Sequence, residues 1–399
     1  MHIAFVLTQS LESPSGLGRY WPISKELVRR DYQVTILALH HNLSELNQRR
    51  FFREGVAVHY AGQMHVRKQG SRKLYFSPWR LLVISLVSTL RLAHSLTLLD
   101  AEVVHLGKPQ PINGLAALLG RRGRPVFCDC DDYEAQTNRF SGEWQRRIVQ
   151  HFEDGVVRYA TGLTVNTRFT SMRYRRLGFP EQRIVYVPNG VDRARFSSLP
   201  NTAKIRQRWG LDEAEPLIVY VGTLGLLSHP VDLLLEAFQQ LVQQQPAARL
   251  MLVGGGEEYD TLKKLTQQLG IAERTIFTGR VPPRDVPGYF ALATVSVDPV
   301  RDDTIARARS PLKAVESLVM GVPVVTGDVG DRRALLKDGE LGVLVPPGDS
   351  QALADGLLAI LQNRSARAHM AQAALACREQ WYWDRLVDDF VQVYAVNHE

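Results

Sequence analysis

The sequence predicts an α/β protein made of two doubly wound, Rossmann-like domains that face each other across a cleft. Short apolar segments alternate with helical patterns along most of the 399 residues, which is typical of parallel sheets with crossover helices. The alternation is interrupted once, by the turn-forming run 188–192 and the polar stretch 197–201, and then restarts. A chain of this length also exceeds what one ordinary core accommodates.

In the first half, short apolar runs predict the strands and amphipathic patterns predict the helices between them. The expected strands are 2–7, 34–39, 56–59, 103–106, 126–128, 163–165 and 184–187. The expected helices include 18–30, 79–96 and 143–159. We therefore place an N-terminal domain at 1–192, with 197–201 as the linker that follows it.

The second half repeats this organisation. Its expected strands are 217–221, 250–253, 275–277, 295–297, 323–326 and 342–345, and its expected helices are 231–244, 257–269, 311–320, 350–362 and one near 383–394. We place a second domain at 193–380 and a closing helical segment at 381–399. In such sheets ligands bind beyond the carboxyl ends of the strands.

Charge and composition narrow the functional classes. The chain carries 48 basic against 41 acidic residues, a formal net charge of +7, which suits an anionic small molecule, an anionic membrane surface or nucleic acid. We expect no nucleic-acid partner, because no zinc-finger spacing or aromatic RNA-binding signature is present. Three cysteines form no disulfide or metal array. Without a signal peptide or a spanning apolar stretch, we expect a cytoplasmic protein, peripheral at most to the inner face of the membrane.

The most informative segment is 307–325. Ser310 is a suitable N-cap and Pro311 suits a first helical position, so we expect a helix to begin there. The N–H groups and positive partial charge of a helix N-terminus together favour phosphate binding. Arg307, Arg309 and Lys313 surround this helix start and add cationic donors.

Glu316 lies in the second turn of the same expected helix. Its carboxylate is placed to accept hydrogen bonds from both hydroxyls of a ribose, as acidic residues do in dinucleotide sites. The alternative is an ordinary amphipathic crossover helix on which Glu316 is simply exposed.

This segment resembles the donor-site signature of the retaining, GT-B-fold glycosyltransferases of family 4, which ends in Glu-x-x-x-x-Gly-x-Pro-Val-Val. The matching residues are Glu316, Gly321, Pro323, Val324 and Val325. The resemblance implies that Glu316 binds the ribose of a nucleoside-diphosphate sugar. It also implies that the helix start, with Ser310, Pro311, Leu312 and Lys313, binds the diphosphate.

Two departures from the family pattern concern the donor. Ala308 stands where the family has a first glutamate that contacts the transferred sugar. The family's arginine and lysine on the loop after the first strand of this domain are also missing, because Thr223 replaces the arginine and Ser228 or His229 the lysine. We expect Thr223 and the backbone of Gly222 to donate neutral hydrogen bonds to phosphate. For Gly222 the alternative is an ordinary strand-to-helix turn.

Further resemblances extend over most of 188–394. Gly279 and Arg280 lie in a segment similar to the loop whose backbone reads the donor base. The run 188–192 resembles the family's interdomain crossover, and 381–383 with the last helix resembles the segment that returns to the N-terminal domain. For those aromatic residues core packing is the alternative. The glycines at 254–256 do not form a dinucleotide fingerprint, because Tyr259 stands where a glycine is needed.

On the acceptor side, Gly16, Gly18 and Arg19 follow the first strand in a glycine-rich segment that leads into a helix. The family has such a loop facing the donor phosphate and the acceptor, so these residues are candidates to contact both. A plain connecting loop is the alternative.

An acidic cluster follows the strand at 126–128. Asp129 and Asp131 could form the Asp-x-Asp metal site of the other major glycosyltransferase fold, an interpretation that the two parallel domains disfavour. Asp131 or Asp132 could instead orient or polarise the acceptor hydroxyl, or the carboxylates could cap a helix. We choose Asp131 and Asp132 as catalytic candidates. His105, which also ends a strand, is interpreted as structural.

The resemblance implies a retaining, metal-independent transfer without a cofactor, in which the leaving diphosphate takes the proton from the acceptor hydroxyl. The expected partners are a nucleotide-sugar donor and a saccharide or lipid-linked acceptor, with peripheral membrane contact through 79–96 as a weaker alternative to a core helix. A sugar-nucleotide epimerase or hydrolase on the same fold, and a non-catalytic nucleotide-sugar-binding homologue, remain as rival functions.

Overall fold

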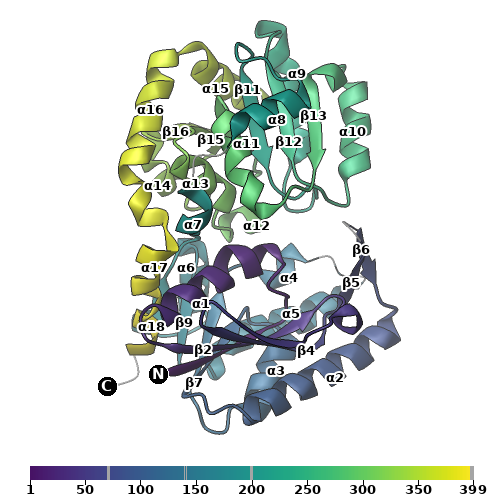
Figure 1. Ribbon diagram of the computed structural model, residues 1–399, viewed down its shortest axis with the longest axis vertical. Helices are drawn as coiled ribbons and strands as arrows, with labels where there is room; N and C mark the ends of the chain where they lie inside the picture. Colours follow the sequence, from purple (N-terminus) through teal and green to yellow (C-terminus); the bar gives the residue numbers. More distant parts are fainter. Residues whose placement is uncertain (70–71, 139, 141, 198–200, 396–399) are drawn as a thin grey trace. The chain divides into compact units, whose positions relative to one another are not determined.

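The computed structural model describes residues 1–69, 72–138, 140, 142–197 and 201–395 (Figure 1), so residues 198–200 of the expected linker lie outside the described residues. The chain divides into two compact units. The first comprises Met1–Asn189, Ala308–Ser310 and Trp383–Glu399, and the second comprises Gly190–Arg307 and Pro311–Tyr382. Each unit is a doubly wound α/β structure, which confirms the predicted fold class.

Within the described residues, the sheet of the first unit has the strand order β10-β9-β8-β7-β1-β2-β4-β3. The strands are β1 (His2–Leu7), β2 (Gln33–His40), β3 (Arg50–Arg53), β4 (Val56–Gln63), β7 (Val103–Gly107), β8 (Val126–Cys130), β9 (Gly162–Val165) and β10 (Ile184–Tyr186). Neighbouring strands are parallel except β3 and β4. The order reverses between β1 and β7, so the loops after these two strands flank the switch point where ligands bind in such sheets.

Every strand expected in this half is present, but three short strands were not predicted. They are β3 and the hairpin of β5 (Val66–Gln69) and β6 (Arg72–Tyr75). β3 is an edge strand that begins and ends with arginine, and β5 and β6 pair only with each other. Short polar strands of this kind lack the apolar run that identifies a buried strand.

The helices of the first unit cover both faces of its sheet. They include η1 (Gly16–Tyr20), α1 (Trp21–Val28), α2 (Pro78–Thr97), α3 (Pro111–Gly120), α4 (Glu134–Thr137), α5 (Glu143–Gly155), α6 (Arg168–Arg176), α17 (Trp383–Phe390) and α18 (Gln392–Ala395). Side chains of α1 and α17 pack with Phe5 in one apolar core. Side chains of α2 and α3 pack with Val6 in a second core on the opposite face.

The segment that begins at Trp383 completes the first core. Trp383 and Phe390 are buried there, and the Trp383 indole N–H donates a hydrogen bond of 2.8 Å to the carbonyl of Gly18. His105 Nδ1 lies 2.7 Å from the Tyr394 hydroxyl, and burial lowers the pKa of His105 to about 3. His105 is therefore a neutral, buried structural side chain, as expected.

In the second unit, the described residues form one sheet with the strand order β13-β12-β11-β14-β15-β16, in which all neighbours are parallel. The strands are β11 (Leu217–Val221), β12 (Arg249–Val253), β13 (Thr275–Gly279), β14 (Val295–Asp298), β15 (Val324–Gly327) and β16 (Gly342–Val345). All six were predicted. The switch point lies between β11 and β14, so the loops after these strands flank the expected binding edge.

The crossover helices of this unit bury apolar faces against the sheet. The helices are α7 (Arg193–Phe196), α8 (Thr202–Trp209), α9 (Val231–Gln244), α10 (Tyr259–Gln268), α11 (Val286–Leu292), α12 (Thr304–Arg307), α13 (Leu312–Val319), α14 (Arg332–Leu335), α15 (Ser350–Gln362) and α16 (Arg364–Cys377). Among the helices of the described ranges, none is sufficiently long and apolar to cross a membrane.

Candidate functional site

Glycine backbones crowd the switch point of the second unit. Gly254 has a φ of +147°, and a Cβ there would lie 1.9 Å from the carbonyl oxygen of Gly222. The loop after β12 can approach the backbone of Gly222 this closely only because Gly254 lacks a side chain. The N–H of Gly222 donates to the Val253 carbonyl at 2.9 Å, so the expectation that this N–H donates to a phosphate is wrong, and Gly222 instead joins the ends of β11 and β12.

Lys313 reaches this switch point from the first turn of α13. Its Nζ lies 3.0 Å from Asp298 Oδ1 at the end of β14 and 3.4 Å from His229 Nδ1. Its Cε lies 3.2 Å from the point where a Cβ on Gly222 would stand. The helix therefore places an ammonium group against the glycine loop, on which the family's arginine and lysine are missing.

Asp298 and Arg332 hold Lys313 in place, and neither was identified from the sequence. Arg332 Nε donates to Asp298 Oδ2 at 2.9 Å, and both side chains are buried. Burial alone would raise the pKa of Asp298, but Lys313 and Arg332 together outweigh it and hold this pKa well below its usual range. The signal was present in the sequence, because Asp298 directly follows an apolar strand run.

The expected cap of α13 is wrong. Pro311, with a ψ of 78°, occupies the N-cap position and the helix begins at Leu312. The Ser310 hydroxyl accepts a hydrogen bond from the N–H of Asn189, and the Asn189 side-chain amide donates to the Ser310 carbonyl. Ser310 therefore belongs, with the half-buried Arg309, to the first unit. The N–H groups of Ala314 and Val315 donate to the Pro311 carbonyl, so the N–H groups that the helix start can present to a ligand are those before Ala314.

Glu316 is buried in α13, so the alternative in which it is merely exposed is wrong. Its Oε1 lies 3.6 Å from an Arg195 nitrogen, and its carboxylate makes no hydrogen bond within the described chain. Burial raises the pKa of Glu316 to about 7, although Arg195 and Lys313 oppose the shift. Arg195 was not identified from the sequence, because it lies more than one hundred residues away in the short helix α7.

The other donor candidates of this unit are surface groups at strand ends. Thr223 and Arg280 are exposed, and the Thr223 carbonyl accepts a hydrogen bond from the Tyr220 hydroxyl. Gly279 has a φ of +70° and its carbonyl accepts from the N–H of Gly254. Gly222, Thr223, Gly279 and Lys313 thus all lie at carboxyl ends of this sheet or at the helix beside it, whereas Ala308 is buried in the first unit.

In the first unit, the glycine-rich segment is not a loop at its candidate residues. Gly16 and Gly18 begin the helical turn η1, and a Cβ on Gly16 would lie 2.4 Å from the Ser10 carbonyl oxygen. Arg19 points into the protein, where its guanidinium donates to both carboxylate oxygens of Asp129 at 2.6 and 2.7 Å.

The same guanidinium also donates to the carbonyls of Val187 and Pro188. The expectation that the Arg19 side chain contacts a ligand is therefore wrong, because its donors are used internally. Asp129 also accepts a hydrogen bond from Thr164 Oγ1. Since Asp129 is fully engaged by these partners, the Asp-x-Asp metal interpretation does not fit the residues present.

Lys108, which the sequence analysis did not identify, organises the remaining carboxylates. It directly follows β7 with a φ of +73°, and its Nζ lies 3.1, 2.9 and 2.7 Å from oxygens of Asp131, Asp132 and Glu134. Burial alone would lower the pKa of Lys108, but the three carboxylates outweigh it and hold this pKa well above its usual value.

Asp131 is the least satisfied member of this cluster. Its Oδ1 is buried and has no hydrogen-bond partner in the described chain, and the contact with Lys108 is ionic only. Burial, together with Asp132 and Asp129, raises the pKa of Asp131 to about 7 against the opposing charge of Lys108. A group with a pKa near neutrality at a strand end is a candidate for hydrogen bonding to a reacting hydroxyl.

The helix-capping alternative for Asp131 and Asp132 is wrong. Tyr133 occupies the N-cap of α4, and the backbone N–H groups of Glu134 and Ala135 donate to the carboxylate of Glu153 on α5. Burial raises the pKa of Glu153 to about 8. The carboxylates of Asp131 and Asp132 therefore contact Lys108 and face the strand edge at which a ligand would bind.

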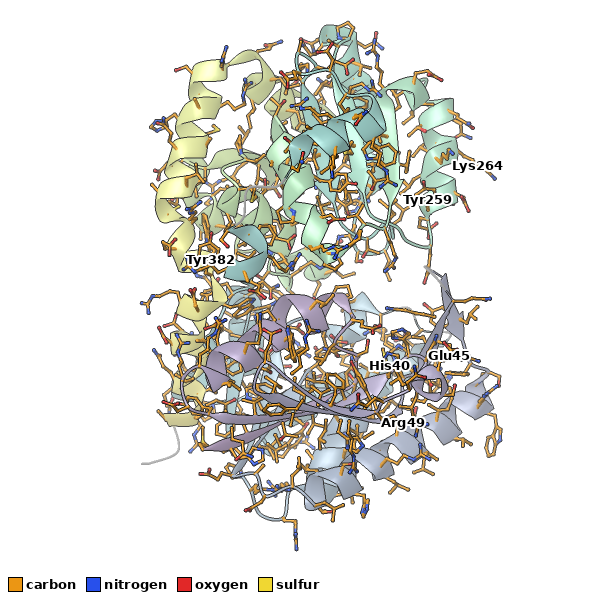
Figure 2. The ribbon with its side chains drawn as sticks, viewed as in Figure 1. His40, Glu45, Arg49, Tyr259, Lys264 and Tyr382 are labelled. Atoms are coloured by element: carbon orange, nitrogen blue, oxygen red, sulfur yellow. The ribbon has the colours of Figure 1, made fainter. Side chains whose placement is uncertain are left out.

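A second cluster of polar side chains, formed by Glu12, His40 and His41, lies at the end of β2. His40, which Figure 2 labels, stacks on His41 with 4.2 Å between ring centroids, and Glu12 Oε2 lies 3.8 and 3.7 Å from their Nε2 atoms. The N–H of Asn42 donates to His40 Nδ1, so in a neutral His40 the proton is on Nε2. The lone pair that a metal ion would need on this Nε2 is therefore not available.

Two family models match the chain. The model described as "Glycosyl transferases group 1" matches residues 201–376, and the model described as "Glycosyl transferase 4-like domain" matches residues 15–190. Together they cover most of both units.

Curated relatives agree with these matches. The chain is 30% identical over 289 residues to a GDP-mannose-dependent alpha-(1-6)-phosphatidylinositol monomannoside mannosyltransferase of Mycolicibacterium smegmatis, covering 71% of this chain and 74% of that protein. It is 32% identical over 263 residues to a D-inositol 3-phosphate glycosyltransferase of Xylanimonas cellulosilytica, covering 63% of this chain and 60% of that protein.

Solved structures show the same fold over the whole chain. A sucrose-phosphate synthase from Thermosynechococcus elongatus superposes with a TM-score of 0.78 at 17% identity, covering 99% of this chain and 98% of that one. HepE of Anabaena, in complex with UDP-glucose, gives a TM-score of 0.72 at 19% identity, with coverages of 99% and 98%. The family matches, the relatives and the GT-B fold together identify the chain as a member of the group 1 (family 4) glycosyltransferases, enzymes that transfer a sugar from a nucleotide-sugar donor.

Proposed function

We propose that this glycosyltransferase works with retention of configuration and without a metal ion. The acceptor oxygen bonds to the sugar C1 on the face that the diphosphate leaves, and the hydroxyl proton passes to the departing phosphate oxygen. The enzyme then acts mainly by positioning the reactants and by stabilising negative charge on the leaving group. No cofactor takes part in this scheme.

The position of Lys313 carries the proposal. Its ammonium group lies at the glycine loop after β11, fixed by Asp298, in a place where it neutralises a diphosphate. This cation on α13 substitutes for the arginine and lysine that the loop lacks. The N–H of Thr223 and the N–H groups at the very start of α13 add neutral donors to the phosphates. The N–H of Gly222 is not among these donors, because it donates to the Val253 carbonyl at 2.9 Å.

We assign Glu316 to the donor ribose. Its carboxylate is buried, lacks a hydrogen-bond partner in the described chain and lies one turn along α13 from Lys313. Two ribose hydroxyls would supply the missing donors. Gly279 and Arg280 then contact the base. Arg309, Ser310 and Pro311 form the segment that leads directly into α13.

For the acceptor we assign Asp131, with Asp132 beside it, as the group that orients the reacting hydroxyl by accepting its hydrogen bond before transfer. As the new bond to C1 forms, the proton passes from that hydroxyl to the departing phosphate oxygen. Lys108 is a positioning residue, because it contacts the carboxylates of both. The two relatives act, by their names, on a phosphatidylinositol monomannoside and on an inositol phosphate. We therefore propose a saccharide or lipid-linked acceptor, and a cytoplasmic enzyme peripheral to the inner face of the membrane.

A thermal-shift screen against UDP, GDP, ADP and their sugar conjugates, with and without magnesium, tests the donor assignment. Binding to the folded state raises the melting temperature with the logarithm of ligand concentration over Kd. We expect a shift for one nucleotide series that magnesium does not change. A shift that requires magnesium would contradict the metal-independent mechanism, and no shift with any nucleotide would favour a non-catalytic homologue.

Glu316→Gln is expected to weaken binding of that nucleotide about 10- to 100-fold, because a hydrogen bond to a charged group contributes about 1.5–3 kcal/mol. Isothermal titration calorimetry measures the change in Kd. Glu340→Gln, an exposed glutamate of the same unit, is the matched control and should bind as the wild type does. Equal Kd values for Glu316→Gln and the wild type would remove Glu316 from the ribose site.

Activity is expected to rise with pH up to about 7 and then level off. The pKa values of Asp131 and Glu316 are both raised to about 7, and the proposed roles require the ionised carboxylates, which form the stronger, charge-assisted hydrogen bonds and are present above the pKa. A plot of log kcat/KM against pH should therefore approach a slope of two on its acid side. In Glu316→Gln the slope should fall to one. A flat profile between pH 5 and 7 would contradict both assignments.

An assay of donor consumption separates the rival enzymes. A hydrolase or an epimerase on this fold would consume or alter the nucleotide sugar without any acceptor. The proposed transferase should release nucleoside diphosphate only when an acceptor is added, apart from slow hydrolysis.

A further inference from the structure

Helix α2 of the first unit turns large apolar side chains toward solvent. Its exposed large apolar residues are Trp79, Leu82, Val83, Leu86, Val87 and Leu90. Their spacing of three and four places them along one face of the helix. They make up six of the 21 large apolar side chains that are exposed in the described part of the chain.

The buried residues of α2 lie in the C-terminal half of the helix and are Ser88, Thr89, Leu92, Ala93 and Leu96. Ser88 and Thr89 are 1% and 6% exposed, and the Ser88 hydroxyl donates to the Gln63 carbonyl, whereas Leu86 and Trp79 are 60% and 74% exposed. A helix that served only the core would expose polar side chains on its other face. The interpretation of 79–96 as a core helix therefore fits its C-terminal half, which packs in the core, but does not account for the apolar side chains exposed over the first three turns.

The apolar face continues onto α3, which lies beside α2 (Figure 1). The two helices approach closely at Gly120, where a Cβ would lie 2.6 Å from the Ala93 carbonyl oxygen. Leu115, Leu118 and Leu119 of α3 are exposed as well. We call the exposed apolar residues of α2 and α3 the α2–α3 face.

The charge around the α2–α3 face is one-sided. Neither helix contains an aspartate or glutamate. Arg80 and Arg91 on α2 and Arg122 just after α3 are exposed. Long apolar side chains bordered by arginines match the interior and the anionic head groups of a bilayer.

A second copy of the chain fits this face less well. In a two-fold dimer the face would meet itself, so the arginines of one copy would approach those of the other. No carboxylate on α2 or α3 could neutralise them. A bilayer with anionic lipids neutralises the arginines and takes up the apolar side chains in one contact.

We propose that the α2–α3 face docks this glycosyltransferase onto an anionic membrane surface. Helix α2, about 30 Å long by its residue count, lies in the plane of the interface with Leu82, Leu86 and Leu90 among the acyl chains. The surface is distinct from the residues assigned to the donor and the acceptor hydroxyl, so the proposal does not depend on the proposed reaction.

The test is co-sedimentation of the full chain with vesicles of phosphatidylcholine, with and without 30% phosphatidylglycerol, at physiological salt. We expect at least tenfold tighter binding to the anionic vesicles. Leu86→Ser with Leu90→Ser should reduce this binding at least fivefold, and Arg80→Gln with Arg91→Gln should remove the preference for anionic lipid. Leu375→Ser, at a leucine of the second unit that is 42% exposed, is the matched control and should bind normally.

Melting curves and nucleotide-induced thermal shifts of the variants show that they are folded. Because the substituted leucines are exposed, we expect no loss of thermal stability. Equal vesicle binding by the wild type and the leucine variant, or no binding by the wild type, would overturn the proposal. A dimer in sedimentation equilibrium that the leucine substitutions dissociate would also overturn it and would assign the face to a second copy.

Discussion

Replacing Arg19 with methionine is expected to lower the free energy of unfolding of the first unit by about 3–5 kcal/mol, because it leaves the buried carboxylate of Asp129 without its cation. Arg19 is 1% exposed and Asp129 is fully buried, and two hydrogen bonds join them. Burial favours the neutral form of Asp129, but Arg19 outweighs it and lowers the pKa of this carboxyl. Differential scanning calorimetry without ligand measures the loss.

Two controls distinguish a buried charge from a general loss of packing. Arg19→Met combined with Asp129→Asn removes both charges and should recover part of the lost stability. Arg146→Met breaks an exposed ion pair with Glu143 in the same unit and should leave the melting temperature unchanged. If Arg19→Met melted like the wild type, the structural role of this pair would be wrong.

Replacing Asp131 with asparagine is expected to lower kcat about 100-fold with little change in donor affinity. The asparagine side chain has nearly the same shape but cannot supply the charged acceptor that Asp131 offers to the reacting hydroxyl, and positioned acid–base groups typically contribute 10²- to 10⁴-fold. Asp132→Asn is the matched comparison. Because Asp132 is partly exposed and its Oδ2 already accepts a hydrogen bond from Lys108, its effect should be several-fold smaller.

Steady-state kinetics and a pH profile together check this prediction. A merely structural role of Asp131 would leave the acid side of the profile in place, whereas the proposed role requires that the slope falls by one in Asp131→Asn. The variant should be folded and at least as stable as the wild type near neutral pH, because a buried carboxylate with a raised pKa costs stability when it ionises. Unchanged kcat in a folded Asp131→Asn variant would remove Asp131 from the reaction.

Much of the fold could be predicted because the buried strands are continuous apolar runs. Each of the six strands of the second unit begins and ends within two residues of its expected bounds. β3 and the β5–β6 hairpin were missed because partly exposed strands lack this run. The exposed apolar face of α2 was also missed, because periodicity indicates the apolar positions of a helix but not which of them stay in contact with solvent.

The residues of the candidate site could be predicted only where they lie together on one short segment of the sequence. Lys313 and Glu316 lie on a single helix, and the spacing between them is visible in the sequence. Lys108 and Arg195 act on residues that are distant along the chain, so their roles depend on contacts that only the folded structure brings together. Arg19 shows the reverse error, since a basic residue in a glycine-rich segment was interpreted as facing a ligand while it pairs with a buried aspartate 110 residues away.

The packing of Trp383 and Phe390 against strand β1 determines the order in which a ribosome-made chain can finish folding. The core of the first unit contains these two side chains together with Phe5 and Ile36, so it stays incomplete until residues beyond 382 have been synthesised. The second unit has all of its own residues by Tyr382. The half of the enzyme that emerges first is therefore completed last, and until then it exposes apolar surface to which chaperones can bind.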